Sequence, residues 1–481
     1  MKTLRMKSMR MKSTNSPLRK LALCVAVAAL SACAATPYRT PELAVPESYG
    51  GKADGATQIA SSFDYAPSNI AADPWWQSFG DDGLNRLIER TLERNNDLAA
   101  ATLRVRRAQL SAGLSKDALW PHLSASVSSG YGKDLKTGES NGRSNSATVS
   151  VSYELDLWNR LGLAADAAQW EAQATAEDRE ATALTLVGTA AQAYWNLAYL
   201  NQRLAFNAAS LERSRRLLEF VQTQFDAGQV SRLELREAEQ SLQNQIATRS
   251  QLEQQRLAAR EALALLLDGE PWPESEEPQD LSAPRSADIE TGLPAELLGR
   301  RPDLRAAELR LKKSLANVDT TRLSFYPTIN LTGSVSSGAP SLSDVLRNPV
   351  GTLGAGLSLP FLRYNERKLD IAIANTDYEL AATQFRQTLL NALSDVNVAL
   401  SARESWNEQV RALTASFEHA RQIESIYEVR YRAGAVALRT WLDAQESRRN
   451  AELSLAQARL SQLQNDIALF QALGGSARAT L

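Results

Sequence analysis

Residues 146–158, SATVSVSYELDLW, alternate between apolar and polar side chains. Every second residue from Val149 to Leu157 is apolar, and the residues between them are hydroxylated or acidic. An alternation of about ten residues is typical of a membrane β-barrel strand that faces lipid on one side and water on the other. Similar patterns predict four strands, at residues 123–131, 147–158, 328–335 and 352–362.

Four strands cannot close a membrane barrel by themselves. An open edge in lipid leaves backbone N–H and C=O groups unpaired, and each unpaired group is strongly destabilising. Two chains would give a barrel whose interior is nearly filled by side chains, whereas three chains would give twelve strands around a wet lumen. The pattern therefore favours a trimer. The alternative is a soluble pair of β-hairpins packed on helices.

Most of the remaining sequence predicts long helices. The first is expected over residues 82–119, with a break near residues 95–97. Residues 161–225 and 363–431 contain no proline and almost no glycine, so each is expected to form one helix of roughly 100 Å. Apolar residues recur at steps of three and four, as in coiled coils, over residues 184–198 and again over residues 453–470 of the expected final helix. The expected fold class is mostly α with β.

The chain partly overlays itself when it is shifted by 206 residues. The matching segments are 96–98 and 302–304, 120–121 and 326–327, 225–230 and 431–436, and 267–269 and 473–475. We infer an internal duplication. Each copy is expected to contribute a helix, two strands, a long helix, a tight turn and a final helix.

The N-terminus has the pattern of an export signal. Residues 1–33 carry seven cations and no acid, and residues 21–30 are an apolar run too short to span a bilayer. The sequence Leu30-Ser31-Ala32-Cys33 resembles the lipobox of bacterial lipoproteins, which implies a covalent lipid on Cys33. Ala34 stands where Asp would favour the inner membrane, so the resemblance implies the outer membrane. The alternative is an ordinary signal peptide with an incidental cysteine.

The composition excludes several function classes. Beyond residue 33 there are 46 cations and 55 acids, which argues against nucleic acid as a partner. His122 and His419 have no companions at ligand or catalytic spacing. Cys24 and Cys33 are the only cysteines, so we expect no disulfide and no thiolate metal site. There is no phosphate loop and no G-x-S-x-G motif. We expect neither an enzyme nor a cofactor other than the lipid.

Several motifs follow one another along the chain. They are PWW at 74–76, NNDL at 95–98, YELDLW at 153–158, LPAELLGRRPDL at 293–304, LDAQ at 442–445 and LGG at 473–475. Together they resemble the bacterial outer membrane factors, the TolC-like ducts of tripartite efflux pumps, in their lipoprotein (OprM/NodT) branch. The resemblance covers nearly the whole chain after the signal.

The resemblance implies a homotrimer with a twelve-strand β-barrel in the outer membrane and a long α-helical barrel in the periplasm. A periplasmic adaptor and an inner-membrane transporter of the RND type would deliver drugs or other toxic small molecules to it. Two alternatives stay open, a duct for secreted polypeptides and a structural coiled-coil lipoprotein of the envelope. Copper or silver export is disfavoured, because the chain after the signal lacks methionine and free cysteine.

The expected segments follow from the signal, the repeat and the resemblance. They are a signal peptide at 1–32, a lipidated extended segment at 33–81, a first repeat at 82–269, an equatorial linker at 270–295, a second repeat at 296–475 and a tail at 476–481. Two features depart from related sequences, which often have glycine at Asn159 and small, alanine-rich residues over 318–322. We assign no function to either departure.

Each repeat has an Ala-Gly turn between its last two helices. Gly228 and Gly434 are expected to adopt positive φ there. The resemblance implies that these turns are periplasmic tips, where exposed side chains meet the adaptor. The candidates are Gln229, Val230, Ala435 and Val436.

The resemblance also implies that Asp443 narrows the periplasmic aperture. Arg439 lies four residues earlier on the same helical face and is expected to pair with Asp443, either within one chain or between chains, and to hold the tip closed. An exposed pair of this kind contributes about 1 kcal/mol or less to stability. The alternatives are a solvated helical pair and, at the tips, plain structural turns.

Overall fold

The computed structural model describes residues 36–38, 49, 74–281 and 297–475. The chain divides into two compact units. Among the described residues, the sheet unit comprises 36–38, 114–167 and 314–377, and the helical unit comprises 49, 74–113, 168–281, 297–313 and 378–475. Each unit therefore takes segments from both halves of the sequence.

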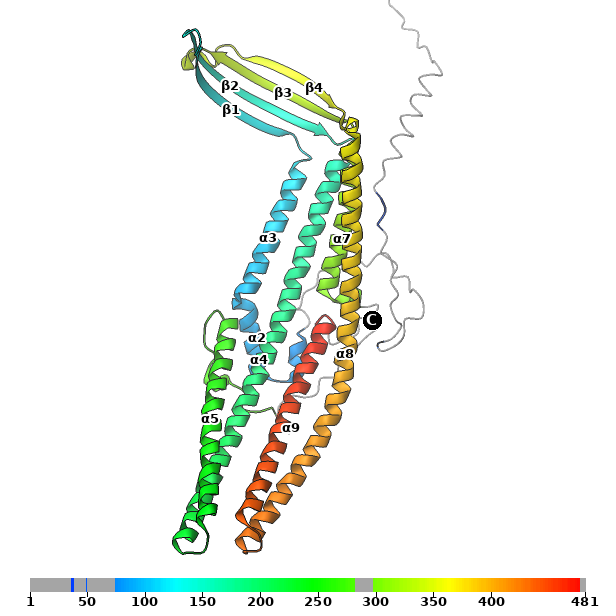
Figure 1. The fold of residues 1–481 in the computed structure, drawn as a ribbon. Helices are drawn as coiled ribbons and strands as arrows, with labels where there is room; N and C mark the ends of the chain where they lie inside the picture. The colour runs from blue at the N-terminus through cyan, green and yellow to red at the C-terminus, as the bar shows by residue number, and fades with distance from the viewer. Residues whose placement is uncertain (1–35, 39–48, 50–73, 282–296, 476–481) are drawn as a thin grey trace, which may run out of the picture. The chain divides into compact units, whose positions relative to one another are not determined.

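The sheet unit contains one antiparallel sheet of four strands (Figure 1). The strands are β1 (His122–Lys133), β2 (Ser140–Leu155), β3 (Thr328–Ala339) and β4 (Val350–Ser358), and they lie in sequence order. β1 and β4 are the two edges of this sheet. The four predicted strands are thus all present.

The register sorts the side chains of the sheet into two faces. Leu123 lies opposite Val151, Val151 opposite Gly333, and Gly333 opposite Leu353, so one face carries apolar rows. A Cβ on Gly333 would approach Val151 Cγ1 to 3.1 Å and Leu353 Cδ2 to 3.3 Å, so glycine leaves room for these two side chains. The predicted alternation between faces is confirmed.

The opposite face carries hydroxyl groups. Its central row is formed by Ser124, Ser150, Ser334 and Thr352. Ser124 Oγ and Ser150 Oγ are hydrogen-bonded at 2.8 Å, and Ser334 Oγ and Thr352 Oγ1 at 2.7 Å. The hydroxyl groups therefore satisfy one another across neighbouring strands.

Two strands end earlier than the alternation predicts. β2 ends at Leu155, because the chain turns there and Trp158 donates from Nε1 to the carbonyl oxygen of Pro327 at 2.7 Å. β4 ends at Ser358, and the 3-10 helix η6 (Pro360–Leu362) follows it. Proline has no N–H for a strand ladder, which explains the second ending.

The helices include the two long ones that the sequence predicts. α4 (Arg160–Asp226) has 67 residues and α8 (Tyr364–Arg432) has 69. In the part of the chain that the structure describes, the other α-helices are α2 (Asp82–Arg94), α3 (Asn96–Asp117), α5 (Arg232–Leu266), α6 (Leu297–Arg300), α7 (Pro302–Leu323) and α9 (Leu438–Ala472). That part also contains the 3-10 helices η2 (Trp75–Phe79), η3 (Glu274–Glu276) and η5 (Leu342–Asp344).

The predicted break in the first helix lies at Asn95. Its Oδ1 accepts hydrogen bonds from the backbone N–H groups of Asp97 (3.0 Å) and Leu98 (3.2 Å), so Asn95 caps the start of α3. None of the helices in the described ranges combines the length and the apolar character needed to cross a lipid bilayer.

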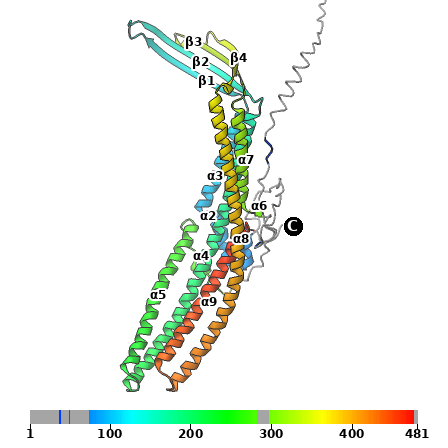
Figure 2. The same cartoon turned by 45° about the vertical axis from the view of Figure 1, so that its right-hand side comes forward.

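The duplication is visible in the element bounds. α3 and α7, β1 and β3, and α5 and α9 each begin and end at positions 206 residues apart. α4 and α8 also end 206 residues apart. In the helical unit, α4 lies beside α5 and α8 beside α9 in both views (Figures 1 and 2).

The helical unit buries the PWW motif. Trp75 and Phe79 are buried, and the Trp75 ring stacks on Phe470 with 4.8 Å between centroids. Phe79 and Phe470 meet edge-on at 6.1 Å. These rings join η2 to the C-terminal part of α9.

Candidate functional site

The two tight turns have the same backbone geometry. Gly228 and Gly434 both have φ of 72°. In each turn the N–H of the glycine donates to the carbonyl oxygen of the residue three positions earlier, at 2.9 Å. The N–H of the residue after the glycine donates to the carbonyl oxygen five positions before that residue, at 2.8 Å in the first turn and 2.9 Å in the second. This is a Schellman motif with glycine in the left-handed position. The predicted positive φ is confirmed at both turns.

The helices that leave the turns are capped differently. Ser231 and Glu234 form a capping box at the start of α5, and the Ser231 N–H donates to Glu234 Oε2 at 3.0 Å. The hydrogen bond from the Ser231 hydroxyl lowers the pKa of Glu234. α9 begins after Ala437, which provides no side-chain cap. The two turns share one backbone geometry, but only the helix after the first turn has a side-chain cap.

A hydrophobic cluster underlies both turns. It is made by Leu217, Val221, Leu235, Ala238, Leu438 and Trp441. Tyr431 stacks on Trp441 with 5.3 Å between centroids, and its hydroxyl donates to Gln224 Oε1 at 3.4 Å. Burial raises the pKa of Tyr431. The cluster therefore joins the α4–α5 hairpin to the α8–α9 hairpin.

The four predicted tip residues differ in their exposure in the single chain. Gln229 and Ala435 are exposed, as expected. Val230 and Val436 are only half-buried positions, and Val230 packs against the hydrophobic cluster. A branched apolar side chain next to the turn gains more from covering that cluster than from facing water. Gln229 and Ala435 are thus the more exposed of the four residues, and contact with an adaptor stays a prediction for all of them.

Arg439 and Asp443 are brought together near the start of α9. Arg439 Nε lies 3.0 Å from Asp443 Oδ1 and 3.3 Å from Oδ2. The two side chains are 68% and 60% exposed in the single chain, so water screens their attraction. The two residues thus pair within one chain, whereas pairing between chains and the role in an aperture stay predictions.

A polar cleft beside the cluster was not predicted. Its volume is about 540 Å³, and Arg213, Glu424 and Trp441 are among the residues that line it. Next to it, Arg448 is buried and pairs with Glu424 and with Glu452, the latter at 2.9 Å. Burial and the nearby Arg448 charge lower the pKa of Arg213. The charged groups at this cleft therefore come from three helices: α4 contributes Arg213, α8 contributes Glu424, and α9 contributes Arg448 and Glu452.

Residues 300–304, the last part of the LPAELLGRRPDL motif, form a junction between α7, α8 and α9. Arg301 pairs with Asp303 at 2.8 Å and with Asp395 at 3.1 Å, and it donates to the carbonyl oxygen of Ala472 at 3.3 Å. A Cβ on Gly474 would lie 2.7 Å from the carbonyl oxygen of Arg300, so the LGG motif allows this close approach. The two motifs are therefore parts of one contact.

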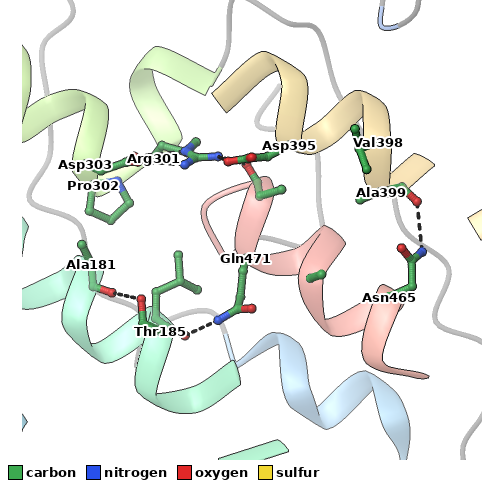
Figure 3. A pocket seen from close by; sticks show the side chains of 13 residues that line it. Ala181, Thr185, Arg301, Pro302, Asp303, Asp395, Val398, Ala399, Asn465 and Gln471 are labelled. Atoms are coloured by element: carbon green, nitrogen blue, oxygen red, sulfur yellow. Dashed lines mark hydrogen bonds and ion pairs between the residues drawn. The ribbon is translucent and has the colours of Figure 1, made fainter. Parts of the chain in front are cut away.

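A cavity of about 560 Å³ lies beside this junction (Figure 3). Gln471 donates to the carbonyl oxygen of Leu184 at 3.4 Å, and Asn465 donates to that of Ala399 at 3.0 Å (Figure 3). These two side-chain amides of α9 thus bond to backbone carbonyl groups of α4 and α8. In the described ranges, no three acids, histidines or cysteines are grouped so as to hold a metal ion.

The family model described as outer membrane efflux protein matches residues 87–269 and again residues 293–475. The chain belongs to the outer membrane efflux protein family. The resemblance expected from the motifs is confirmed. The protein is accordingly an efflux protein of the bacterial outer membrane.

Named relatives and a solved structure agree with this family. The pyoverdine export outer membrane protein OpmQ of Pseudomonas putida is 33% identical over 421 residues, which cover 84% of this chain and 88% of the relative. Toxin and drug export protein A of Aggregatibacter actinomycetemcomitans is 31% identical over 415 residues, covering 85% and 89%. The open state of the Neisseria gonorrhoeae MtrE outer membrane channel matches 93% of this chain and 100% of its own, with a TM-score of 0.77 and 27% identity.

One expected site of this efflux protein lies outside the described residues. Cys33 and its lipobox fall in residues 1–35, so lipidation remains a prediction. Asn159 has φ of 59°, the left-handed conformation that asparagine tolerates in place of glycine. The second departure, over residues 318–322, includes the buried Asp319.

Proposed function

We propose that three copies of this efflux protein form the exit duct of a tripartite efflux system. The sheet supports this proposal, because one of its faces is apolar, the other is hydroxylated, and both of its edge strands lack a partner on their outer side within the sheet. Lipid suits the first face and water the second. The duct would conduct passively and would have no catalytic residues.

Closure of the sheet supports three copies. β1 has 12 residues and β4 has 9, so each edge offers a long row of unpaired backbone groups. Pairing β4 of one copy with β1 of the next would satisfy both edges and leave no open edge in lipid. Three copies of a four-stranded sheet give twelve strands around a lumen that water can fill.

Exposed apolar residues on two helices support the same assembly. α3 exposes Leu103, Leu110 and Leu114, which lie on one helical face. α8 exposes Leu369, Ile373 and Leu380, which are also spaced along one face. Single apolar side chains on a surface are ordinary, but a row along a helix indicates a packing partner. We assign both rows to contacts between copies.

Aromatic residues flank the strands. Trp120 precedes β1, and Phe361 and Tyr364 follow β4; all three are exposed. Trp and Tyr are typical of the boundary between lipid and water in membrane proteins. We propose that this end of the sheet lies at the inner surface of the outer membrane, where a lipid on Cys33 would also insert.

The tips are proposed to receive a periplasmic adaptor, which would connect the duct to an inner-membrane transporter of the RND type. Gln229 and Ala435 are exposed on two turns of equal geometry, so three chains would present six similar turns. The names of the relatives, which refer to pyoverdine, toxin and drug export, support small toxic molecules as cargo.

A crosslinking experiment tests this function. A photoreactive residue at Ala435 or Gln229 should capture a periplasmic adaptor in living cells. The same residue at Leu265 should not, because Leu265 is also exposed but lies at the far end of α5 from the turn. Assembled protein that captures no adaptor at either tip would contradict the tip assignment. Absence of heat-sensitive trimers in detergent would instead support the structural lipoprotein.

A further inference from the structure

We propose that Asp319 is the docking site for an N-terminal arm of the same chain, here defined as residues 36–38. The Thr36 backbone N–H donates to Asp319 Oδ2 at 2.7 Å, and the Thr36 hydroxyl donates to Oδ1 at 2.8 Å. The two residues are 283 positions apart. One residue of the arm therefore binds both oxygens of one carboxylate.

The burial of Asp319 makes this contact more than a surface hydrogen bond. Asp319 is 5% exposed, and it lies near the C-terminal end of α7 in the same sheet unit as Thr36. A buried carboxylate is strongly destabilising unless donors surround it. Arg322 supplies one further donor, at 3.2 Å from Oδ1, so Oδ2 takes its hydrogen bond from the arm.

The other repeat shows that the helix does not need this acid. Gly113 is the counterpart of Asp319 under the shift of 206 residues, and it lies on α3 at the matching place before β1. A Cβ added to Gly113 would meet nothing within 4 Å. Both repeats make the same helix-to-strand junction, but only one carries the carboxylate. A chain has one N-terminus, so one docking site is sufficient.

The docking site constrains where a lipid can attach. Cys33 precedes Thr36 by three residues, and three residues of extended chain reach about 11 Å at most. A lipid on Cys33 would therefore be held close to the end of α7 that leads into β3. This consequence rests on the proposed outer-membrane function and on lipidation, whereas the contact itself does not.

Trypsin provides the test, because Arg39 directly follows the described arm residues. In the full-length protein purified in detergent, the initial rate of cleavage after Arg39 is measured by mass spectrometry of the released peptide. Docking holds the neighbouring residues and slows cleavage, since a protease acts on the open form. Asp319→Asn and Asp319→Ala should each raise the rate by about tenfold or more, because a hydrogen bond to a charged group is lost.

Matched variants complete the design. Thr36→Val removes only the hydroxyl donor, so it should raise the rate of cleavage after Arg39 by less than the Asp319 variants do. In a protein that already carries Asp319→Asn, adding Thr36→Val should raise the cleavage rate by still less. Asp377→Asn, at an exposed position of the same unit, should leave the rate unchanged. Rates within twofold of the unmodified protein for both Asp319 variants would overturn the docking site. The mass of the released peptide reports separately whether Cys33 carries a lipid.

Discussion

Arg256 Nη2 lies 2.7 Å from Glu277 Oε2, and the Glu277 side chain is only 1% exposed. Arg260 approaches the other carboxylate oxygen from one turn further along α5, at 2.9 Å. Glu277 follows η3 in the acidic stretch after the first repeat. Two arginines on one helical face thus hold this stretch against α5.

Removing the charge at Glu277 should destabilise the helical unit. Glu277→Gln is expected to lower the free energy of unfolding by about 2 kcal/mol, because charged hydrogen bonds at a buried position are lost. Glu274 also pairs with Arg260, but its side chain is 65% exposed, so Glu274→Gln should change the free energy of unfolding by less than about 1 kcal/mol. Denaturation followed by circular dichroism measures both variants. Equal effects would show that burial of Glu277 is unimportant.

The pairing of Arg439 with Asp443 should affect conduction more than stability. Replacing both residues by alanine is expected to raise single-channel conductance in planar bilayers, because the charged side chains would no longer narrow the aperture. Glu408→Ala with Arg411→Ala is the control, since that pair is similarly exposed on α8. Unchanged conductance in the Arg439 and Asp443 variant would exclude the gate.

The two faces of the sheet should respond differently to a charge. Leu353 on the apolar face is 95% exposed in the single chain, and its neighbour Thr352 lies on the hydroxyl face. Leu353→Arg should cost about 2–4 kcal/mol in lipid and prevent membrane assembly, whereas Thr352→Arg should assemble. The yield of heat-sensitive trimers in outer-membrane fractions measures this. Equal yields would contradict the assignment of the faces.

Gly434 should be sensitive to substitution because of its backbone alone. A Cβ there would meet nothing within 4 Å, but φ is positive, so Gly434→Ala should destabilise the turn by about 1–2 kcal/mol. Hydrogen exchange of the Ala435 amide should then become roughly tenfold faster. Gly299→Ala is the control, since Gly299 has the same free space in α6 without a positive φ. Unchanged exchange after Gly434→Ala would mean that the turn tolerates the strain.

Local patterns predicted the regular elements well. Helices expected at 161–225 and 363–431 are α4 and α8, whose bounds differ from those ranges by one residue at each end. The period at which apolar residues recur differs between a helix and a strand, so over a long element it distinguishes the two. The strand ends were less accurate. Trp158 leaves the strand to bond with Pro327, a contact between distant residues that alternation cannot encode.

The contacts that join distant segments could not be predicted. Val230 follows a turn, which predicts an exposed side chain, but it packs against the hydrophobic cluster, whose residues come from both hairpins. Arg301 stood in a recognised motif, yet its partner Asp395 lies 94 residues away. Thr36 and Asp319 share no local pattern at all. Such contacts depend on how helices pack in space, which sequence spacing within one helix does not specify.

The hydroxyl rows of the sheet have a consequence for ion flow. Ser and Thr side chains are uncharged at every pH that the cell meets, so the central rows place no fixed charge along the proposed lumen. Small cations and anions would then permeate this stretch with similar ease, and a salt gradient across a bilayer would produce only a small reversal potential. Any preference for the sign of a solute must then come from Glu154 at the end of β2, which lies on the same face, from the helices, or from the proteins that load them.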